Sequence, residues 1–141
     1  MRKLAKPLDV DFINKTFFPC DSDVSKINEG RCFLWAYTAF RLFKGLELWS
    51  NGSHAFVKSK VTGKFYDSET PHGAYDWTML PATYDGEGCG CLICQKGARR
   101  ARTIKQFQYT WRGLQKRYNV DYLKVDEKVK SVIHGLQNHE R

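Results

Sequence analysis

One hydrophobic run, over residues 32–44, constrains the fold of this chain more than any other feature. Only Thr38, Arg41 and Lys44 are polar within it, so the segment is apolar most of the way around a helix. A helix of that kind is buried at the centre of a domain. Because Gly45 follows directly and favours the end of a helix, the sequence predicts a central core helix over residues 32–44.

Cys32 stands in the first turn of this helix, directly after a loop at residues 25–30. Unpaired backbone N–H groups and the positive end of the helix dipole favour an anion at that position. A thiol placed there is shifted toward the thiolate, which is the reactive form. A lone cysteine is, however, most often a small buried core residue, so Cys32 by itself indicates no chemistry.

The composition fits one globular domain over residues 1–141. Hydrophobic residues make up 42% of the chain and aromatic residues 14%, which is typical of a folded protein with a core. No stretch approaches the length of a membrane span, and the first residues lack the apolar run of a signal peptide. Five cysteines, an odd number without a secretion signal, favour a reducing compartment, so we expect a cytoplasmic protein with no membrane contact.

Hydrophobic periodicity predicts the remaining elements. Strands are expected over residues 46–49, 54–60 and 64–68, with turns at 50–53 and 62–63. Residues 1–20 contain a strand or short helix, and 71–97 are irregular. Toward the C-terminus we expect an amphipathic helix over 98–118, a short strand at 121–124 and a last helix near 126–136.

Two residues form a set with Cys32. His54 starts one predicted strand, and Asp67 lies on the strand that returns beside it. A thiolate attacks a carbonyl carbon while an imidazole takes and returns the proton. A carboxylate orients the imidazole and stabilises its charged form. The backbone N–H of Cys32 is then a natural oxyanion donor, so these three residues predict a site for nucleophilic catalysis.

The motifs around these residues are GRCFLWA at 30–36, HAFVKS at 54–59 and GKFYDSETP at 63–71. In this order they resemble the transglutaminase-like core of the papain-like cysteine proteinase superfamily, over residues 28–72. In that core a Gly-x-Cys opens a helix, a His-Ala-aromatic-Val strand follows, and a strand ending in Asp completes the triad.

The resemblance implies that Cys32 is the nucleophile, His54 the general base and acid, and Asp67 the orienting residue. It implies an α+β fold, with the cysteine helix packed on an antiparallel sheet and helices C-terminal to it. The expected function is a thiol-dependent amide hydrolase (a peptidase, isopeptidase or deamidase) that acts on a protein or peptide through an acyl-thioester and needs no cofactor. The chain is too short for the further domains of transglutaminases and acetyltransferases, which favours hydrolysis over coenzyme-dependent transfer.

The sequence departs from the family pattern before the histidine and upstream of the cysteine. The short spacing between Cys32 and His54 implies that one intervening strand is trimmed or lost. The side chain that completes the oxyanion hole in many relatives has no sure counterpart. Asn28 is the candidate, and a role as a loop cap fits it about equally well.

The turn between the last two strands decides whether Asp67 reaches His54. A two-residue turn at 62–63 would set Asp67 opposite Lys58, about 13 Å along the strand from His54. The triad therefore requires a wider or bulged turn around residues 59–62. Glu69, Asp76 or His72 would otherwise take a role, although each is more often a surface polar residue.

A tight thiol cluster lies in the glycine-rich stretch 86–97. Cys89, Cys91 and Cys94 are three candidate zinc ligands, with Cys20 or His72 as the fourth. The Cys-x-Cys spacing is unusual for a zinc knuckle and no second Cys-x-x-Cys exists, which favours reduced thiols. In that case the stretch is a flap that borders the substrate cleft.

The net charge of +8 comes from the C-terminal third of the chain. Residues 96–118 contain eight basic residues and no acidic one. In the predicted helix 98–118 an apolar stripe is formed by Ile104, Phe107, Trp111, Leu114 and Tyr118. The basic residues off that stripe are Arg99, Arg102, Lys105, Arg112, Lys116 and Arg117. They form either a solvated face or a contact surface for nucleic acid or an acidic partner. The alternative function is accordingly a catalytically inactive module of this fold that binds through residues 98–118.

Overall fold

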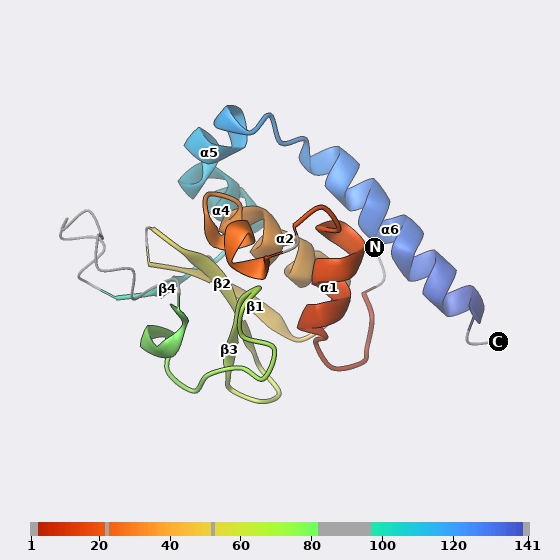
Figure 1. The fold of residues 1–141 in the computed structure, drawn as a ribbon, viewed down its shortest axis with the longest axis horizontal. Helices are drawn as coiled ribbons and strands as arrows, with labels where there is room; N and C mark the ends of the chain where they lie inside the picture. Colours follow the sequence, from red (N-terminus) through yellow and green to blue (C-terminus); the bar gives the residue numbers. More distant parts are fainter. Residues whose placement is uncertain (1–2, 22, 52, 82–96, 140–141) are drawn as a thin grey trace.

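The protein has an α+β fold, in which the α-helices gather on one side of a four-stranded antiparallel sheet (Figure 1). The computed structural model describes residues 3–21, 23–51, 53–81 and 97–139. The elements in chain order are α1 (Val10–Phe17), η1 (Val24–Asn28), α2 (Cys32–Leu42), β1 (Leu46–Ser50), β2 (Ala55–Ser59), β3 (Phe65–Tyr66), η2 (Trp77–Met79), β4 (Arg99–Arg100), α4 (Ile104–Thr110), α5 (Arg112–Arg117) and α6 (Tyr122–His139). Along this part of the chain no helix is long and apolar enough to cross a membrane.

Helix α2 confirms the predicted core helix. Its buried side chains point to all sides, as the apolar run requires: Cys32, Phe33, Trp35, Ala36, Tyr37, Thr38, Ala39 and Leu42. The helix ends two residues earlier than expected, and the chain then turns at Gly45, whose φ of 75° favours glycine. Because α2 contacts β1, β2 and α6, it lies between the sheet and the C-terminal helix (Figure 1).

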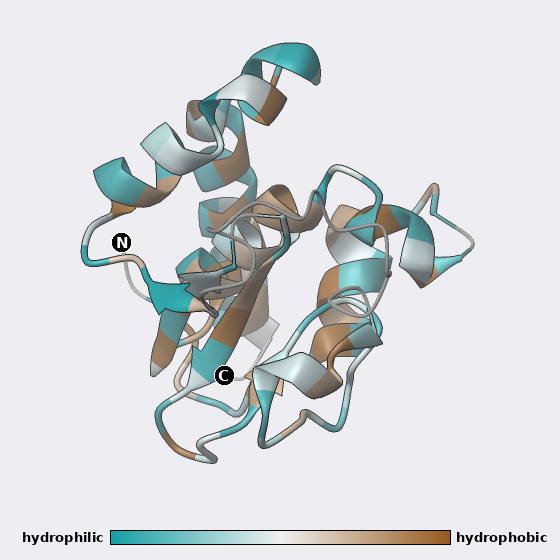
Figure 2. Cartoon of the chain, turned by 90° about the vertical axis from the view of Figure 1, so that its left-hand side faces the viewer, coloured by the Kyte–Doolittle hydropathy of each residue, from teal (hydrophilic) through white to brown (hydrophobic). Residues whose placement is uncertain are grey.

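The sheet has the strand order β3-β2-β1-β4, and it separates two clusters of apolar side chains. The face toward α2 carries Leu46, Leu48, Ala55, Val57 and Tyr66, which belong to the main core. The opposite face carries Phe56 and Phe65, which pack with Leu80 in a smaller cluster bordered by η2. Figure 2 shows hydrophobic residues on the central strands, and both hydrophobic and hydrophilic residues on the helices.

Strand β4 corrects the prediction of a single helix over residues 98–118. Arg99 and Arg100 pair with Ser50 and Trp49 of β1, and the N–H of Ala101 donates to the carbonyl of Leu48 at 2.8 Å. The backbone groups at the start of this segment are thus satisfied by the sheet, and the helix begins only later.

The remainder of residues 98–118 is divided into α4 and α5. Thr103 caps α4 by accepting a hydrogen bond from the N–H of Gln106 at 3.0 Å. The helix is interrupted at Trp111, whose backbone leaves helical geometry while its side chain is buried and stacks on Phe33 at 6.2 Å between ring centroids. The predicted apolar stripe does face the core, except that Tyr118 is 41% exposed.

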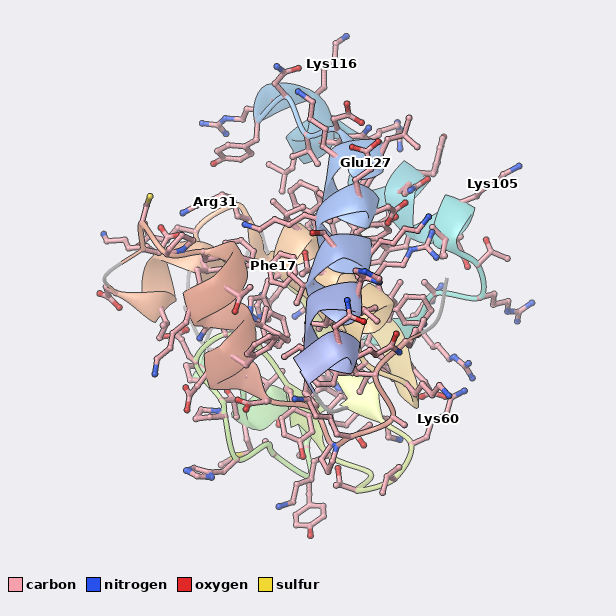
Figure 3. The ribbon with its side chains drawn as sticks, turned by 90° about the vertical axis from the view of Figure 1, so that its right-hand side faces the viewer. Phe17, Arg31, Lys60, Lys105, Lys116 and Glu127 are labelled. Atoms are coloured by element: carbon pink, nitrogen blue, oxygen red, sulfur yellow. The ribbon has the colours of Figure 1, made fainter. Side chains whose placement is uncertain are left out.

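Helix α6 runs across α2 beside α1, as the positions of Glu127 and Phe17 in Figure 3 show. The predicted strand at 121–124 is wrong, because Asp121 starts the helix by accepting from the N–H of Leu123 at 3.0 Å. The predicted inward residues of the last helix do face the core: Val129 and Ile133 are buried, and Val125, Val132 and Leu136 are partly buried.

Asn14 connects three parts of the fold through its buried amide. Its Nδ2 donates to the carbonyl of Ser68 at 2.9 Å, and its Oδ1 accepts from Nε1 of Trp35 at 2.8 Å. The side chain therefore ties α1 to α2 and to the segment that follows β3. Residues 1–20, for which sequence allowed a strand or a helix, thus contribute a helix that supports the centre of the fold.

Replacing Asn14 with Ala should lower the free energy of unfolding by about 2 kcal/mol, because the buried groups of Trp35 and Ser68 lose these partners. Urea denaturation followed by circular dichroism measures this change. Lys15→Ala, at an exposed position of the same helix, is the control and should change stability by less than about 0.5 kcal/mol. Equal effects of the two substitutions would show that the Asn14 bonds do not stabilise the fold.

Candidate active site

Cys32 is the first residue of α2 and is 2% exposed. The preceding Arg31 is the N-cap, and its side chain makes no capping hydrogen bond. The positive end of the helix is thus left without a side-chain acceptor beside the sulfur. This is the placement that the sequence predicted for Cys32.

His54 lies just before β2, where an Asn51-centred turn fixes its backbone. The Asn51 Oδ1 accepts from the N–H of His54 at 2.8 Å and from the N–H of Ser53 at 3.1 Å. The N–H of Asn51 in turn donates to the carbonyl of His54 at 3.2 Å. The predicted turn at 50–53 thus has its described counterpart in the bonds of Asn51, although Ser50 belongs to β1, and these bonds hold His54 at the end of the sheet.

Asp67 follows β3, and its two carboxylate oxygens have separate partners. Oδ1 accepts from the N–H of Glu69 at 3.0 Å and from the hydroxyl of Thr70 at 2.7 Å. Oδ2 lies 2.9 Å from Nε2 of His54. One oxygen is thus held by the local turn, and the other is free to orient the imidazole.

The strand register explains how His54 and Asp67 meet. Val57 pairs with Tyr66, and a four-residue turn at 60–63 closes through a 2.9 Å bond from the N–H of Ser59 to the carbonyl of Lys64. Continuing that register sets Asp67 opposite Phe56, so His54 is its diagonal neighbour rather than its direct partner. Diagonal residues on one face are about 7–8 Å apart, which the two side chains span.

The turn is therefore wider than two residues, as the triad requires. The observed register lies two residues from the pairing of a two-residue turn, and the diagonal contact removes the need for His54 to stand directly opposite Asp67. The rings of His54 and Phe56 lie 5.6 Å apart, which agrees with their placement on one face of the sheet.

Electrostatics in this buried pair favour a charged histidine. Burial alone lowers the pKa of His54, since it disfavours the imidazolium. The hydrogen bond to Asp67, together with the interaction of the ring with Cys32 and the negative charge of the Asp67 carboxylate, outweighs burial and raises the pKa of His54 from 6.5 to about 9. The ring's other nitrogen, Nδ1, is buried, and none of the described residues meets the distance and angle of a hydrogen bond to it, so the effect of Cys32 on the ring is not that of a formed hydrogen bond. Two predicted partners, Cys32 and Asp67, thus both act on His54.

Asn28 is placed differently from an oxyanion donor. Its Nδ2 donates to Oε2 of Glu69 at 2.6 Å, which ties η1 to the segment after Asp67. This contact favours the alternative role of Asn28 as a structural tie of the loop. Asp67 lies beside His54, so the residues considered in its place are not needed for that role. Of these, Asp76 caps η2 and His72 is exposed.

Tyr118 lies close to the loop before Cys32, and nothing in the sequence around Tyr118 predicts this contact. The hydroxyl of Tyr118 lies over Gly30, where an added Cβ would clash with the Tyr118 oxygen. Gly30 also has a φ of 96°, which L side chains rarely adopt. The sequence assigned Tyr118 only to a helical stripe, whereas the structure places it on the loop that leads to Cys32.

The proposed zinc ligands Cys89, Cys91 and Cys94 lie outside the described residues, as does the flap at 86–97 apart from Gly97. Cys20 and His72, considered as a fourth ligand, are both exposed. Across the described ranges, no three histidine, cysteine, aspartate or glutamate side chains are grouped so as to hold a metal ion.

The basic residues predicted to face solvent do so: Arg99, Arg102, Lys105, Arg112, Lys116 and Arg117 are all exposed. Lys105 and Lys116 point away from the body of the protein (Figure 3). These residues do not share one helix, since they are divided among β4, α4, α5 and the connections between them.

No protein-family model, curated protein or solved structure matches this chain. Its function is therefore inferred from the geometry around Cys32, His54 and Asp67.

Replacing Asp67 with Asn should lower the pKa of His54 from about 9, because the imidazolium loses its anionic hydrogen-bond partner. NMR titration of the His54 ring measures this shift. Cys32→Ala should also lower the His54 pKa, and Asp11→Asn, at an exposed position of α1, should leave it unchanged. A His54 titration that is identical in Asp67→Asn and the wild type would contradict the proposed origin of the shift.

The same pair should make stability depend on pH. A histidine whose pKa rises from 6.5 to about 9 on folding stabilises the fold fully below pH 6.5, and this contribution is lost as the pH rises through about 9. Thermal unfolding across that range should show the decline in the wild type and a weaker decline in Asp67→Asn. If stability declined equally with pH in Asp67→Asn and the wild type, groups other than this pair would be responsible for the decline.

Proposed function

We propose that the protein is a thiol-dependent amide hydrolase that acts through an acyl-thioester on Cys32. The observation that carries the proposal is the buried 2.9 Å contact between Nε2 of His54 and Asp67. Cys32 also contributes to the raised pKa of this ring. This contact orients the imidazole and favours its charged form. Its other nitrogen, Nδ1, is then the one available for proton transfer with the sulfur.

In the proposed first half-reaction, the sulfur of Cys32 attacks the amide carbonyl carbon while His54 holds the proton taken from the thiol. The backbone N–H of Cys32 stabilises the oxyanion. The imidazolium then donates its proton to the leaving nitrogen as the carbon–nitrogen bond breaks. A His54 pKa of about 9 suits this step, because the ring is charged near neutral pH.

The second half-reaction returns the enzyme to its starting state. Neutral His54 takes a proton from water as the water oxygen attacks the thioester carbon. The carbon–sulfur bond breaks, the acid is released, and the proton returns to the thiol–imidazole pair. Asp67 remains ionised throughout and holds the ring in one orientation.

The arrangement of elements supports the same proposal. A buried helix that begins at the cysteine, an antiparallel sheet beside it, and histidine and aspartate at the ends of adjacent strands are what the transglutaminase-like and papain-like resemblance implies. Plain hydrolysis fits this chain without a cofactor, because the three side chains supply the nucleophile, the acid–base group and the orienting group.

Alkylation with iodoacetamide near neutral pH tests the reactivity of Cys32 without knowledge of the substrate. Cys20 is exposed, whereas Cys32 is 2% exposed, so accessibility alone predicts that Cys20 reacts faster. An activated Cys32 should react at least about tenfold faster than Cys20. Peptide mapping by mass spectrometry assigns the label to each cysteine.

His54→Gln should slow labelling of Cys32 and leave labelling of Cys20 unchanged. Cys32→Ala should abolish hydrolysis of peptide and glutamine amides, a loss of about 10⁴-fold or more, with Cys20→Ala as the matched control. Ammonia release would indicate deamidation, and a new amino terminus would indicate peptide cleavage. Full activity in Cys32→Ala would exclude the mechanism.

The alternative, an inactive binding module, gives the opposite pattern in the same experiment. Cys20 would then react faster than Cys32, and His54→Gln would have no effect on labelling. The exposed basic residues of segment 98–118 are compatible with this alternative, which leaves the buried His54–Asp67 pair without a catalytic role.

A further inference from the structure

A groove lined by arginines lies at the edge of the sheet, against β4. Its volume is about 810 Å³, and its lining residues are Trp49, Ala98, Arg99, Arg100, Arg102 and Gln106. None of these residues is acidic, so the groove presents positive charge and a partly buried aromatic ring. Such a lining favours a ligand that carries carboxylates.

The three arginines of this groove differ in whether a carboxylate of the protein pairs with their charge. Nη1 of Arg100 lies 2.8 Å from Oε2 of Glu47, so its charge is paired inside the protein. Arg99 and Arg102 are exposed, and no carboxylate of the described residues forms an ion pair with either side chain. These two guanidinium groups are therefore the ones available to a negatively charged partner.

Strand β4 also offers backbone groups to a partner. Among the strands of the described residues it is the last in the order β3-β2-β1-β4, so one of its sides pairs with none of them (Figure 1). The N–H of Ala101 bonds to Leu48, and Arg100 pairs with Trp49 in the neighbouring position. Because antiparallel ladders alternate, the N–H and C=O of Arg100 point to the open side. An extended peptide is the ligand that such an edge accepts.

The groove lies at the same end of the sheet as the proposed catalytic residues. Ser50 pairs with Arg99 on one side and with Ala55 on the other, and Ala55 follows His54. A peptide added outside β4 would lie about three strand spacings, or roughly 15 Å, from β2. An extended chain covers that distance in about four residues.

We propose that the substrate is a polypeptide with an acidic segment, which adds as a strand to the free edge of β4 and pairs its carboxylates with Arg99 and Arg102. This inference rests on the proposed hydrolase function, and it places the acidic segment about four residues from the scissile amide. The free edge recognises a peptide backbone, and the arginines select its charge.

The test measures binding separately from catalysis. Fluorescence anisotropy with the Cys32→Ala protein compares a labelled peptide rich in Asp and Glu with the same peptide carrying Asn and Gln. The acidic peptide should bind at least about tenfold more tightly. Methylation of alternate backbone nitrogens should abolish binding, because strand addition needs those N–H groups.

Charge reversal locates the site. Arg99→Glu/Arg102→Glu in the same background should weaken binding of the acidic peptide at least about tenfold. Lys60→Glu/Lys130→Glu makes the same change in net charge at exposed positions outside the groove and should weaken binding less than about twofold. Circular dichroism establishes that both variants are folded.

Three results would overturn the proposal: equal loss in the two charge-reversed proteins, equal binding of the neutral peptide, or tighter binding of a single-stranded oligonucleotide at Arg99 and Arg102. Iodoacetamide labelling of Cys32 in the protein that retains this cysteine reports on the hydrolase function independently. Normal Cys32 reactivity without acidic-peptide binding excludes the groove proposal alone. Acidic-peptide binding with an unreactive Cys32 excludes the hydrolase, and with it the assignment of the peptide as substrate.

Discussion

The hydrogen bond between His54 and Asp67 is the interaction on which the rest of the proposed site depends. Burying a charged pair costs desolvation energy, which is offset only when the remaining polar atoms are satisfied. Here the second oxygen of Asp67 accepts from Glu69 and Thr70. The next residue, Ser68, is tied by its carbonyl to Asn14 of α1. The N-terminal helix and the turn after β3 thus hold the carboxylate where the imidazole needs it.

The burial that strengthens the His54–Asp67 hydrogen bond also restricts the access of a substrate to Cys32. Cys32 and His54 are each 2% exposed, so a carbonyl reaches the sulfur only if groups over α2 move. The hydroxyl of Tyr118 covers Gly30, two residues before the cysteine. Tyr118 is 41% exposed and follows the last turn of α5. Tyr118 thus covers the loop before Cys32 without belonging to the main core.

Local patterns predicted the elements whose form depends on near neighbours. The apolar run fixed α2, and the turn residues around Asn51 placed His54 correctly. Residues 98–118 were misjudged because pairing with β1 and burial of Trp111 against Phe33 depend on distant partners. The same reason explains why the register at Asp67 stayed open, since a turn's length cannot be read from Thr62 and Gly63 alone. Contacts such as Tyr118 on Gly30 have no local signal at all.

The arginines at the edge of the sheet have two possible explanations: protection of the edge from other chains, or binding of an acidic ligand. The arrangement of the arginines distinguishes between the two. Edge strands commonly carry positive residues because charge prevents pairing with other chains. Protection of that kind requires only that the charge be exposed, and Arg100 with its partner Glu47 already meets the requirement. It does not account for two further unpaired arginines around one groove. Their position beside an open ladder, at the end of the sheet that carries His54, is what a site for an acidic strand requires. The edge would then admit one class of chain and exclude the rest.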